Sequence, residues 1–347
     1  MMIASSETLP SPTRGLRLFS SLLVALVVLL ICIGAQVTSK EAGMTVPDWP
    51  TSFGYNMYDL PFNRWVGVPG VFWEHSHRMF AGIVGAMTVV LAVWVGVREP
   101  RAWVRNLAFS AVGLVVLQGV VGGLRVVWAY NDFGIVHGTL AQLFLITTGL
   151  IALSYTRSWQ GQPPQADRLP RSWQRAAHLV AGLVLCQLVL GAVMRHQHAG
   201  LSIPDFPTAY RHLWPHITPE RLDGINLNRL AHHLPPTTAA QIYLQLSHRA
   251  VALVIFIGIY LFGLDVLRCR QSPPHLRRLA LAWILLVSLQ VVLGACTVLS
   301  GKNPWIASAH VVTGALLLLT GSHLAALITK WRRAAKEPAL APAVPAA

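Results

Sequence analysis

Long apolar stretches with few charges constrain the fold of this sequence more than any other feature. A helix needs about 20 mostly apolar residues to cross the roughly 30 Å hydrocarbon core of a bilayer. Only 12% of the residues are charged, against about 25% in a soluble domain. We therefore predict an all-α integral membrane protein. The eight expected transmembrane helices cover Leu18–Val37, Val71–Val97, Trp103–Leu124, Phe133–Tyr155, Arg175–Met194, Ile242–Val266, Leu279–Leu299 and Trp305–Ile328.

Basic residues set the expected orientation of these helices. The formal charge of +14 would suggest nucleic-acid binding in a soluble protein. Of the 27 Lys and Arg, however, 17 lie in one set of loops or at the span ends that adjoin them, eight lie in the longer alternate loops, and two, Arg78 and Arg249, lie deeper within spans. Lys and Arg concentrate on the cytoplasmic side of membrane proteins. The split predicts a multi-pass protein of the cell (inner) membrane with both termini cytoplasmic, embedded in the lipid bilayer, with no nucleic-acid partner.

The sequence contains an internal repeat. The segment AGMTVPDWP at 42–50 recurs as AGLSIPDFP at 199–207, and SHR at 76–78 recurs at 247–249. Each half holds four spans, so both halves face the same way and are expected to be related by a pseudo-two-fold axis along the membrane normal. The predicted units are two tandem four-helix bundles: an N-terminal half at 1–156, a cytoplasmic linker at 157–172, and a C-terminal half with a cytoplasmic tail at 173–347.

Four histidines open spans at one predicted depth. His77 and His248 open the second and sixth spans, and His137 and His310 open the fourth and eighth. Ionisable residues inside membrane helices are costly and usually face a bundle interior. Two facing imidazoles suit the axial ligation of haem iron, whereas zinc normally takes four ligands. We therefore predict these four histidines as metal ligands, two for a haem iron in each half. A hydrogen-bonded histidine at a helix interface is the alternative for any single position.

Two arginines and one further histidine accompany these candidates. Arg78 and Arg249 directly follow a predicted ligand and could hold haem propionates. The alternative for each is an arginine that snorkels or pairs helices. His75 adjoins His77 but points away around the helix, so we do not expect it to be a ligand.

The two halves differ at one position beside the histidines. Glu74 precedes His77 by three residues, and Gln245 holds the equivalent position before His248. Positions i and i+3 share a helix face. A carboxylate can take a proton or stabilise positive charge, and an amide does neither well. The difference suggests that the reaction occurs in the first half and electron handling in the second. The alternative is an interfacial Glu74 exposed to water.

Together these motifs resemble the haem A synthase family, from about Leu18 to Ile328. The resemblance rests on the Pro-Asp-Trp-Pro loop, Glu74-x-x-His77-Arg78, His137, Ser247-His248-Arg249 and His310. It implies a membrane oxidoreductase of cytochrome oxidase assembly, which oxidises a ring methyl of haem O to a formyl group and yields haem A for terminal oxidases.

The resemblance also implies roles for individual residues. His77 and His137 would hold the substrate haem O, Glu74 would be the essential acidic residue, and His248 with His310 would ligate a haem b cofactor. Many bacterial members carry a cysteine pair in an outer loop, whereas the segment Thr38–Val71 has no cysteine. A haem O synthase and a membrane electron donor or acceptor are the expected protein partners.

Two other functions use the same features. A dihaem cytochrome b-type membrane protein would pass electrons through the four histidines without oxidising a substrate, and it would not need Glu74. A small-molecule transporter built from repeats could use the histidines as proton relays. The haem content of the purified protein separates these three functions.

Overall fold

The computed structural model describes residues 14–161 and 169–334, and within them it contains eight helices long and apolar enough to cross a membrane. No strand occurs in this part of the chain; the pairs Ser52–Tyr55 and Ala209–His212 form isolated bridges. The prediction of an all-α protein with eight such helices is confirmed. The helices are α1 (Arg14–Ser39), α2 (Pro69–Arg98), α3 (Ala102–Val127), α4 (Phe133–Ser154), α6 (Arg171–His196), α8 (Ala239–Arg268), α9 (Pro274–Leu299) and α10 (Pro304–Ala334).

Most of these helices extend beyond the predicted spans. Two of the apolar windows stop one or two residues before Arg98 and Arg268, and each of these arginines is the last residue of its helix. A basic side chain can keep its charge at the membrane surface while its backbone remains helical. Helix ends therefore lie outside the apolar windows from which the sequence predicts them.

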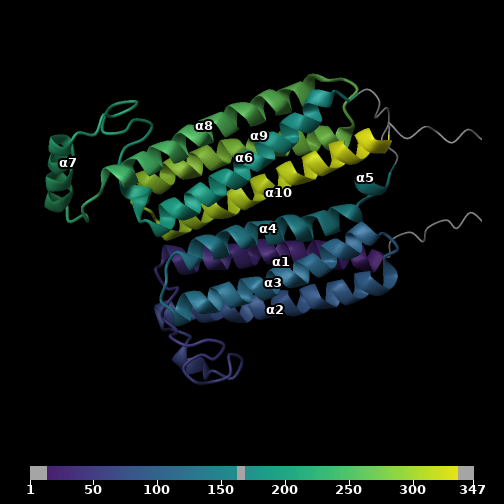
Figure 1. Ribbon diagram of the computed structural model, residues 1–347, viewed down its shortest axis with the longest axis horizontal. Coiled ribbons are helices and arrows are strands. Elements are labelled where there is room, and N and C mark those ends of the chain that lie inside the picture. Colours follow the sequence, from purple (N-terminus) through teal and green to yellow (C-terminus); the bar gives the residue numbers. More distant parts are fainter. Residues whose placement is uncertain (1–13, 162–168, 335–347) are drawn as a thin grey trace, which may run out of the picture.

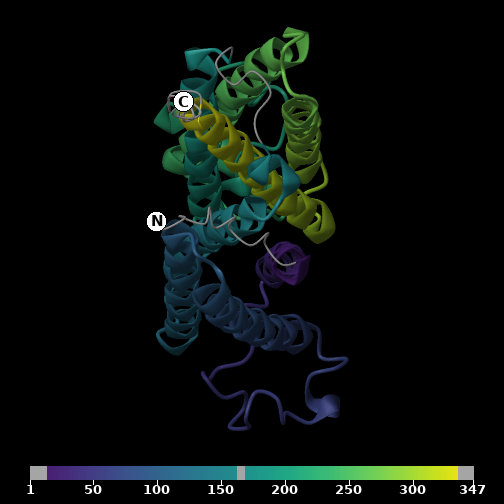
Figure 2. The same ribbon diagram turned by 90° about the vertical axis from the view of Figure 1, so that its right-hand side faces the viewer.

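The helices contact one another in two consecutive sets. α1 packs on α2 and α4, and α3 packs between α2 and α4; in the same way α6 packs on α8 and α10, and α9 packs between α8 and α10. The sets meet where α1 contacts α10 and where α4 contacts α6 and α10 (Figures 1 and 2). Buried apolar side chains form a main cluster in each set.

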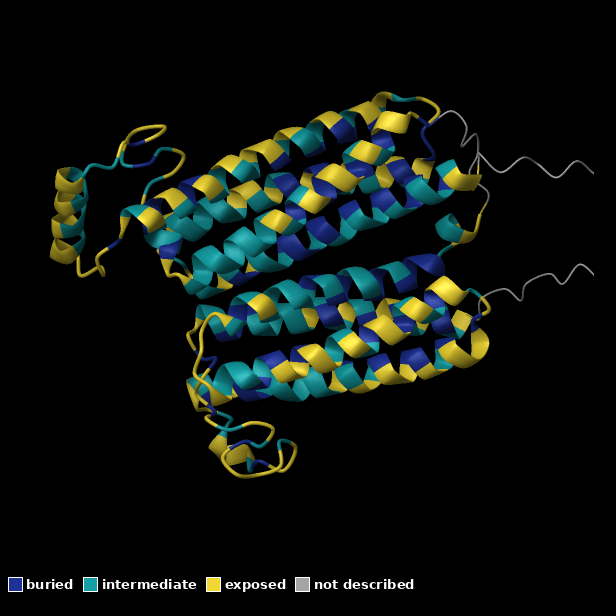
Figure 3. Cartoon of the chain, in the orientation of Figure 1, coloured by how far each residue is buried: buried dark blue, intermediate teal, exposed yellow. Residues whose placement is uncertain are grey.

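Many residues on the outward faces of the helices are exposed (Figure 3), and large apolar residues are among them. Val93, Leu261 and Leu285 are each 60% or more exposed. Contiguous exposure of this kind is unfavourable in water. In hydrocarbon the same side chains are well solvated, and the backbone groups are satisfied within each helix. The chain is therefore a multi-pass membrane protein.

The long connections lie at one end of the helices (Figure 1). The segment 40–68 between α1 and α2 includes η1 (Phe62–Arg64), and the segment 197–238 between α6 and α8 includes η3 (Ala199–Leu201) and α7 (Pro219–Ala231). We name this end the α7 end. The short helix α5 (Arg157–Gln160) lies at the opposite end, which we name the α5 end.

Candidate functional site

The structure brings together the first predicted pair of histidines. His77 of α2 and His137 of α4 have ring centroids 6.4 Å apart, and their planes are inclined by 73°. An imidazole nitrogen binds a transition metal at about 2 Å, which places the centroids of two rings on opposite sides of one metal about 6 Å apart. The spacing of this pair would allow both imidazoles to bind a single iron.

The second pair has equivalent surroundings. His248 lies on α8 and His310 on α10, two helices that both pack against α6 and α9. In all four histidines the Nδ1 atom is buried and has no hydrogen-bond partner. Buried polar nitrogens normally have a partner. Four such nitrogens at repeat-related positions favour imidazoles that are kept for a bound group, and on this observation the residues present fit a haem in each half.

A glycine on a neighbouring helix lies against each imidazole ring. A Cβ atom placed on any of these four glycines would approach the Cε1 atom of its histidine to between 2.9 and 3.2 Å, closer than ordinary van der Waals contact. A larger side chain would push the ring aside, so the glycines fix where each imidazole lies. The pairs are Gly34 with His77, Gly122 with His137, Gly191 with His248, and Gly294 with His310.

Glu74 is buried and fastens the segment 40–68 to α2. Glu74 is 4% exposed, so the alternative of a water-exposed carboxylate is wrong. Oε2 accepts hydrogen bonds from the backbone N–H groups of Thr45 (2.7 Å) and Val46 (3.0 Å) and from the Thr45 hydroxyl (3.0 Å). Oε1 accepts from Nη2 of Arg78 at 2.6 Å, which makes a buried ion pair.

Gln245 makes the equivalent contacts without a charge. Its Oε1 accepts from the N–H of Ile203 at 2.7 Å, and its Nε2 donates to the carbonyls of Gly200 (3.1 Å) and Ile203 (3.3 Å). Glu74 and Gln245 therefore hold equivalent loops, but only the first brings a negative charge to its site.

Both candidate arginines donate to the loop that precedes them. Nη1 of Arg78 donates to the carbonyls of Asp48 (2.7 Å) and Thr51 (3.2 Å), and its Nη2 donates to Val46. Arg249 donates to the carbonyls of three residues at the equivalent loop positions, Thr208, Asp205 and Ile203. The two guanidinium groups therefore stabilise the loops, whatever else they bind.

An aspartate closes each loop internally. Asp48 accepts from the Thr51 hydroxyl and from the backbone N–H groups of Phe53 and Gly54. Burial acts to raise the pKa of Asp48, but these hydrogen bonds outweigh it and hold that pKa below its usual value. In the second loop Asp205 accepts from the equivalent groups, the Thr208 hydroxyl and the backbone N–H groups of Tyr210 and Arg211. These hydrogen bonds likewise outweigh burial and lower the pKa of Asp205.

Histidines outside the two pairs have other contacts. His75 is buried and its ring lies 5.1 Å from that of Trp65, away from the pair. His323 bonds through Nε2 to the carbonyl of Gly149 at 3.1 Å. His196 is the last residue of α6, two residues beyond the predicted span Arg175–Met194, and it packs against Gly134 of α4. Across the described residues no three His, Cys, Asp or Glu side chains cluster as a metal site.

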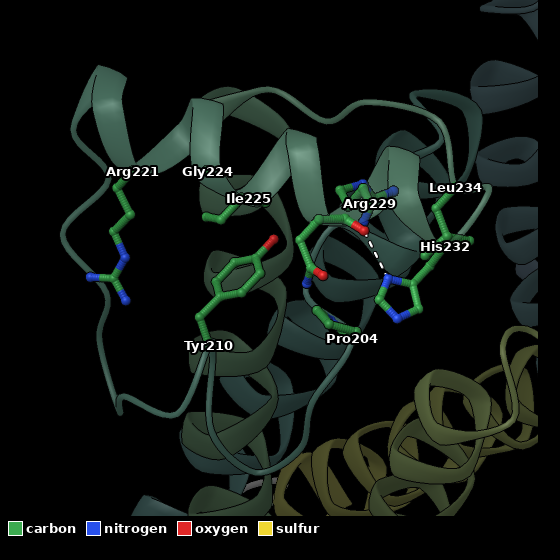
Figure 4. A pocket seen from close by; sticks show the side chains of 9 residues that line it. Pro204, Tyr210, Arg221, Gly224, Ile225, Arg229, His232 and Leu234 are labelled. Atoms are coloured by element: carbon green, nitrogen blue, oxygen red, sulfur yellow. Dashed lines mark hydrogen bonds between the residues drawn. The ribbon is translucent and has the colours of Figure 1, made fainter.

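The segment 197–238 encloses a separate cavity of about 580 Å³ beneath α7 (Figure 4). The cavity was not predicted from the sequence. Its basic residues are partly engaged: Arg229 donates to the carbonyls of Leu201 (2.8 Å) and Pro235 (2.8 Å), and the ring of His232 bonds to Asn228. None of the predicted site residues lines it.

The fold and the paired histidines define a class: a multi-pass helical membrane protein whose helices hold paired imidazoles suited to haem. Residues 66–321 match the family described as cytochrome oxidase assembly protein. Because this match covers more than half of the sequence, the chain belongs to that family.

Individual relatives agree with this assignment. The chain is 27% identical over 341 residues to heme A synthase from Geobacillus kaustophilus, with 92% of this chain and 94% of the relative covered. It is 26% identical to the heme A synthase of Geobacillus thermodenitrificans, with coverages of 92% and 93%. The Staphylococcus aureus (strain MSSA476) protein of the same name is 26% identical over 253 residues, which is 68% of this chain and 72% of that protein.

Proposed function

We propose that this chain is a haem A synthase, a membrane oxidoreductase that converts the substrate haem O to haem A by oxidising a ring methyl to a formyl group. The observation that carries the proposal is the unequal pair of histidine sites. Each contains two histidines whose buried Nδ1 atoms have no hydrogen-bond partner, but the first has the buried Glu74 carboxylate where the second has Gln245. The family and the names of the relatives support the same activity. They do not favour the alternative of a dihaem cytochrome that only passes electrons.

Each pair has its own role in this proposal. His77 and His137 bind the iron of the substrate haem, and His248 and His310 bind a haem b cofactor. A bound haem supplies redox chemistry that amino-acid side chains lack. The protein contributes position: the glycines beside the rings fix the imidazoles, and the surrounding apolar helices exclude water.

Glu74 is the residue to which we assign the chemical difference between the halves. Its carboxylate is held beside His77 by Arg78 and by the loop amides, so it cannot rotate away during turnover. A fixed negative charge in a site with little water stabilises positive charge that develops nearby. Arg78 and Arg249 remain our predicted contacts for the haem propionates, in addition to their bonds to the loops.

The proposal includes a domain arrangement. Residues 1–156 form the substrate half, 157–172 a cytoplasmic linker and 173–347 the cofactor half, related by a pseudo-two-fold axis along the membrane normal. The parallel sets of helix contacts support this arrangement. The ends 1–13 and 335–347 and the linker residues 162–168 lie outside the described residues.

We also propose that the α7 end faces away from the cytoplasm and that the membrane is the cell (inner) membrane. The 17-to-8 split of basic residues supports this orientation. Reporter fusions after Gln160 of α5 and after Arg221 of α7 should then give opposite signals. Partners are a haem O synthase that supplies the substrate and a membrane electron donor or acceptor.

The haem content of the purified protein tests this function. A synthase with both sites occupied should be red, and acid extraction should yield haem b together with haem O, haem A or their alcohol intermediate. Haem b alone, from cells that make haem O, would favour the electron-transfer alternative, and a colourless protein would favour a transporter.

A further inference from the structure

Arg125, near the end of α3, is a half-buried cation for which the described residues provide no hydrogen-bond or ion-pair partner. Its Nε atom is buried and has no hydrogen-bond partner, and its guanidinium forms no hydrogen bond or ion pair with any described residue. A guanidinium carries five donors and stays charged at all physiological pH values. Its isolation inside a membrane protein is unfavourable, so this side chain is a candidate for binding an anion.

Arg125 lies beside the first pair of histidines. On α3 it follows Gly122, the residue that contacts the ring of His137, by three positions, or about 4.5 Å along the helix toward the α7 end. Positions i and i+3 share a helix face, so Arg125 lies one turn from the contact between Gly122 and His137. On its other side Nη1 packs against the loop, 2.9 Å from where a Cβ of Gly43 would stand.

The charges around Arg125 leave an excess of positive charge. Glu74 is the acidic group that acts on it, but the carboxylate of Glu74 is already paired with Arg78 at 2.6 Å. A second arginine, Arg195, donates to the carbonyl of Ala35 and the hydroxyl of Ser39 on α1 and forms no ion pair with a described residue. An anion placed at Arg125 would therefore meet a guanidinium that no described carboxylate already pairs with.

The second half is built differently at this point. Thr297 of α9 follows Gly294 by three residues, as Arg125 follows Gly122, and therefore occupies the position equivalent to Arg125. The Thr297 hydroxyl donates to the carbonyl of Leu293 at 2.7 Å. Gly200, the equivalent of Gly43, is approached instead by the side chain of Lys302, whose Cδ lies 3.6 Å from where a Cβ would stand. The first half alone has a planar guanidinium here, which can bind both oxygens of a carboxylate at once.

We propose that Arg125 binds a propionate carboxylate of the haem that occupies the His77–His137 site as substrate, an inference that rests on the proposed function of that site. Haem presents its two carboxylates on one edge of an otherwise apolar ring. Binding one of them would fix the rotation of the ring about the axis through the two imidazoles. Arg125 is then a substrate-positioning residue that decides which ring methyl lies near Glu74.

The test measures binding, without turnover, on purified protein that retains haem b. Haem O and its propionate dimethyl ester are each titrated in detergent, with binding followed by visible difference spectra. His77→Ala protein supplies the blank for sites other than the first pair. We expect the wild type to prefer the free acid, and Arg125→Gln to weaken acid binding about 10- to 100-fold while leaving ester binding unchanged. Lys302→Gln, the matched change in the other half, should leave both unchanged.

Three results would contradict parts of this inference. Equal binding of acid and ester by the wild type, a result that requires no substitution, would overturn the role of Arg125. Equal weakening of acid and ester in Arg125→Gln with haem b retained would also overturn it, because the residue would then be structural. Failure of the wild type to bind either compound above the His77→Ala blank would overturn the proposed substrate site itself and Arg125 with it.

Discussion

Oε1 of Glu74 accepts a hydrogen bond from Nη2 of Arg78 at 2.6 Å, one helical turn away on α2. The second oxygen of the same carboxylate accepts from loop amides, so one side chain joins the helix, the arginine and the loop beside His77. In the second half Gln245 bonds the loop, and Arg249 has no acidic partner among the described residues. The two sites thus share a scaffold, and a buried ion pair present only in the first is one of the differences between them.

The substitution Glu74→Gln should abolish most of the activity without unfolding the protein. Gln245 shows that an amide can hold the equivalent loop, so folding and haem b content should survive. Loss of one well-placed stabilising group costs on the order of 10²–10³ in rate. Haem O, or its partly oxidised alcohol, should accumulate. The measurement is the ratio of haem O to haem A in cells that express each variant at matched levels.

The reciprocal substitution, Gln245→Glu, is the control for that experiment. It introduces a carboxylate at the equivalent position beside His248, where we place the cofactor and not the substrate. It should change the haem ratio much less than Glu74→Gln. Normal haem A formation by Glu74→Gln would show that Glu74 only fastens the loop.

The histidine pairs predict which variants lose the resident haem. His248→Ala or His310→Ala should remove the haem b spectrum, because a pair that has lost one ligand no longer holds an iron on both sides. His323→Ala should retain it, since His323 instead bonds α10 to the Gly149 carbonyl of α4. Absorption spectra of the purified variants test this. A spectrum that survives His310→Ala but disappears in His323→Ala would contradict the assignment.

The glycines beside the imidazoles should be as restrictive as the ligands. On α6 a Cβ at Gly191 would lie 3.2 Å from Cε1 of His248, whereas a Cβ at Gly182 would meet nothing within 4 Å. Gly191→Val should therefore displace the ring and lower haem b occupancy, and Gly182→Val on the same helix should not. Haem-to-protein ratios after purification provide the comparison. Equal ratios in the two variants would mean that the ring can move without losing its ligand role.

The segment 40–68 should keep its conformation across the neutral range. The lowered pKa of Asp48 means that its stabilising hydrogen bonds are fully present above the usual value of 3.8 and are lost only as pH falls through the lower folded-state pKa. Protection of the Phe53 and Gly54 amides from hydrogen exchange, corrected for intrinsic rates, should be constant from about pH 5 to 8. It should fall in Asp48→Asn. A loss of protection near neutral pH in the wild type would contradict this account of the loop.

The features that the sequence predicts are those that repetition and the bilayer impose. The requirement for long apolar helices reveals the eight spans, and two histidines at matching positions of each repeat identify the pairs. The glycine contacts and the isolation of Arg125 could not be predicted, because they depend on which helices are neighbours and how each is rotated. From the sequence alone, Arg125 cannot be distinguished from the other basic residues that lie near the ends of spans. α7 was missed although Thr218 caps it and Pro219 begins it, because such signals are hard to distinguish within a long polar loop.

The central claim is that this chain oxidises haem O to haem A at the site that contains Glu74. The most direct measurement is chromatography of the haems extracted from cells that are supplied with haem O, lack their own haem A synthase, and express either this chain or no chain. We predict that haem A appears only in the cells that express the chain and that Glu74→Gln returns the profile toward haem O. Haem O as the sole product with the wild-type chain, in cells where the purified protein carries its haem b, would contradict the claim.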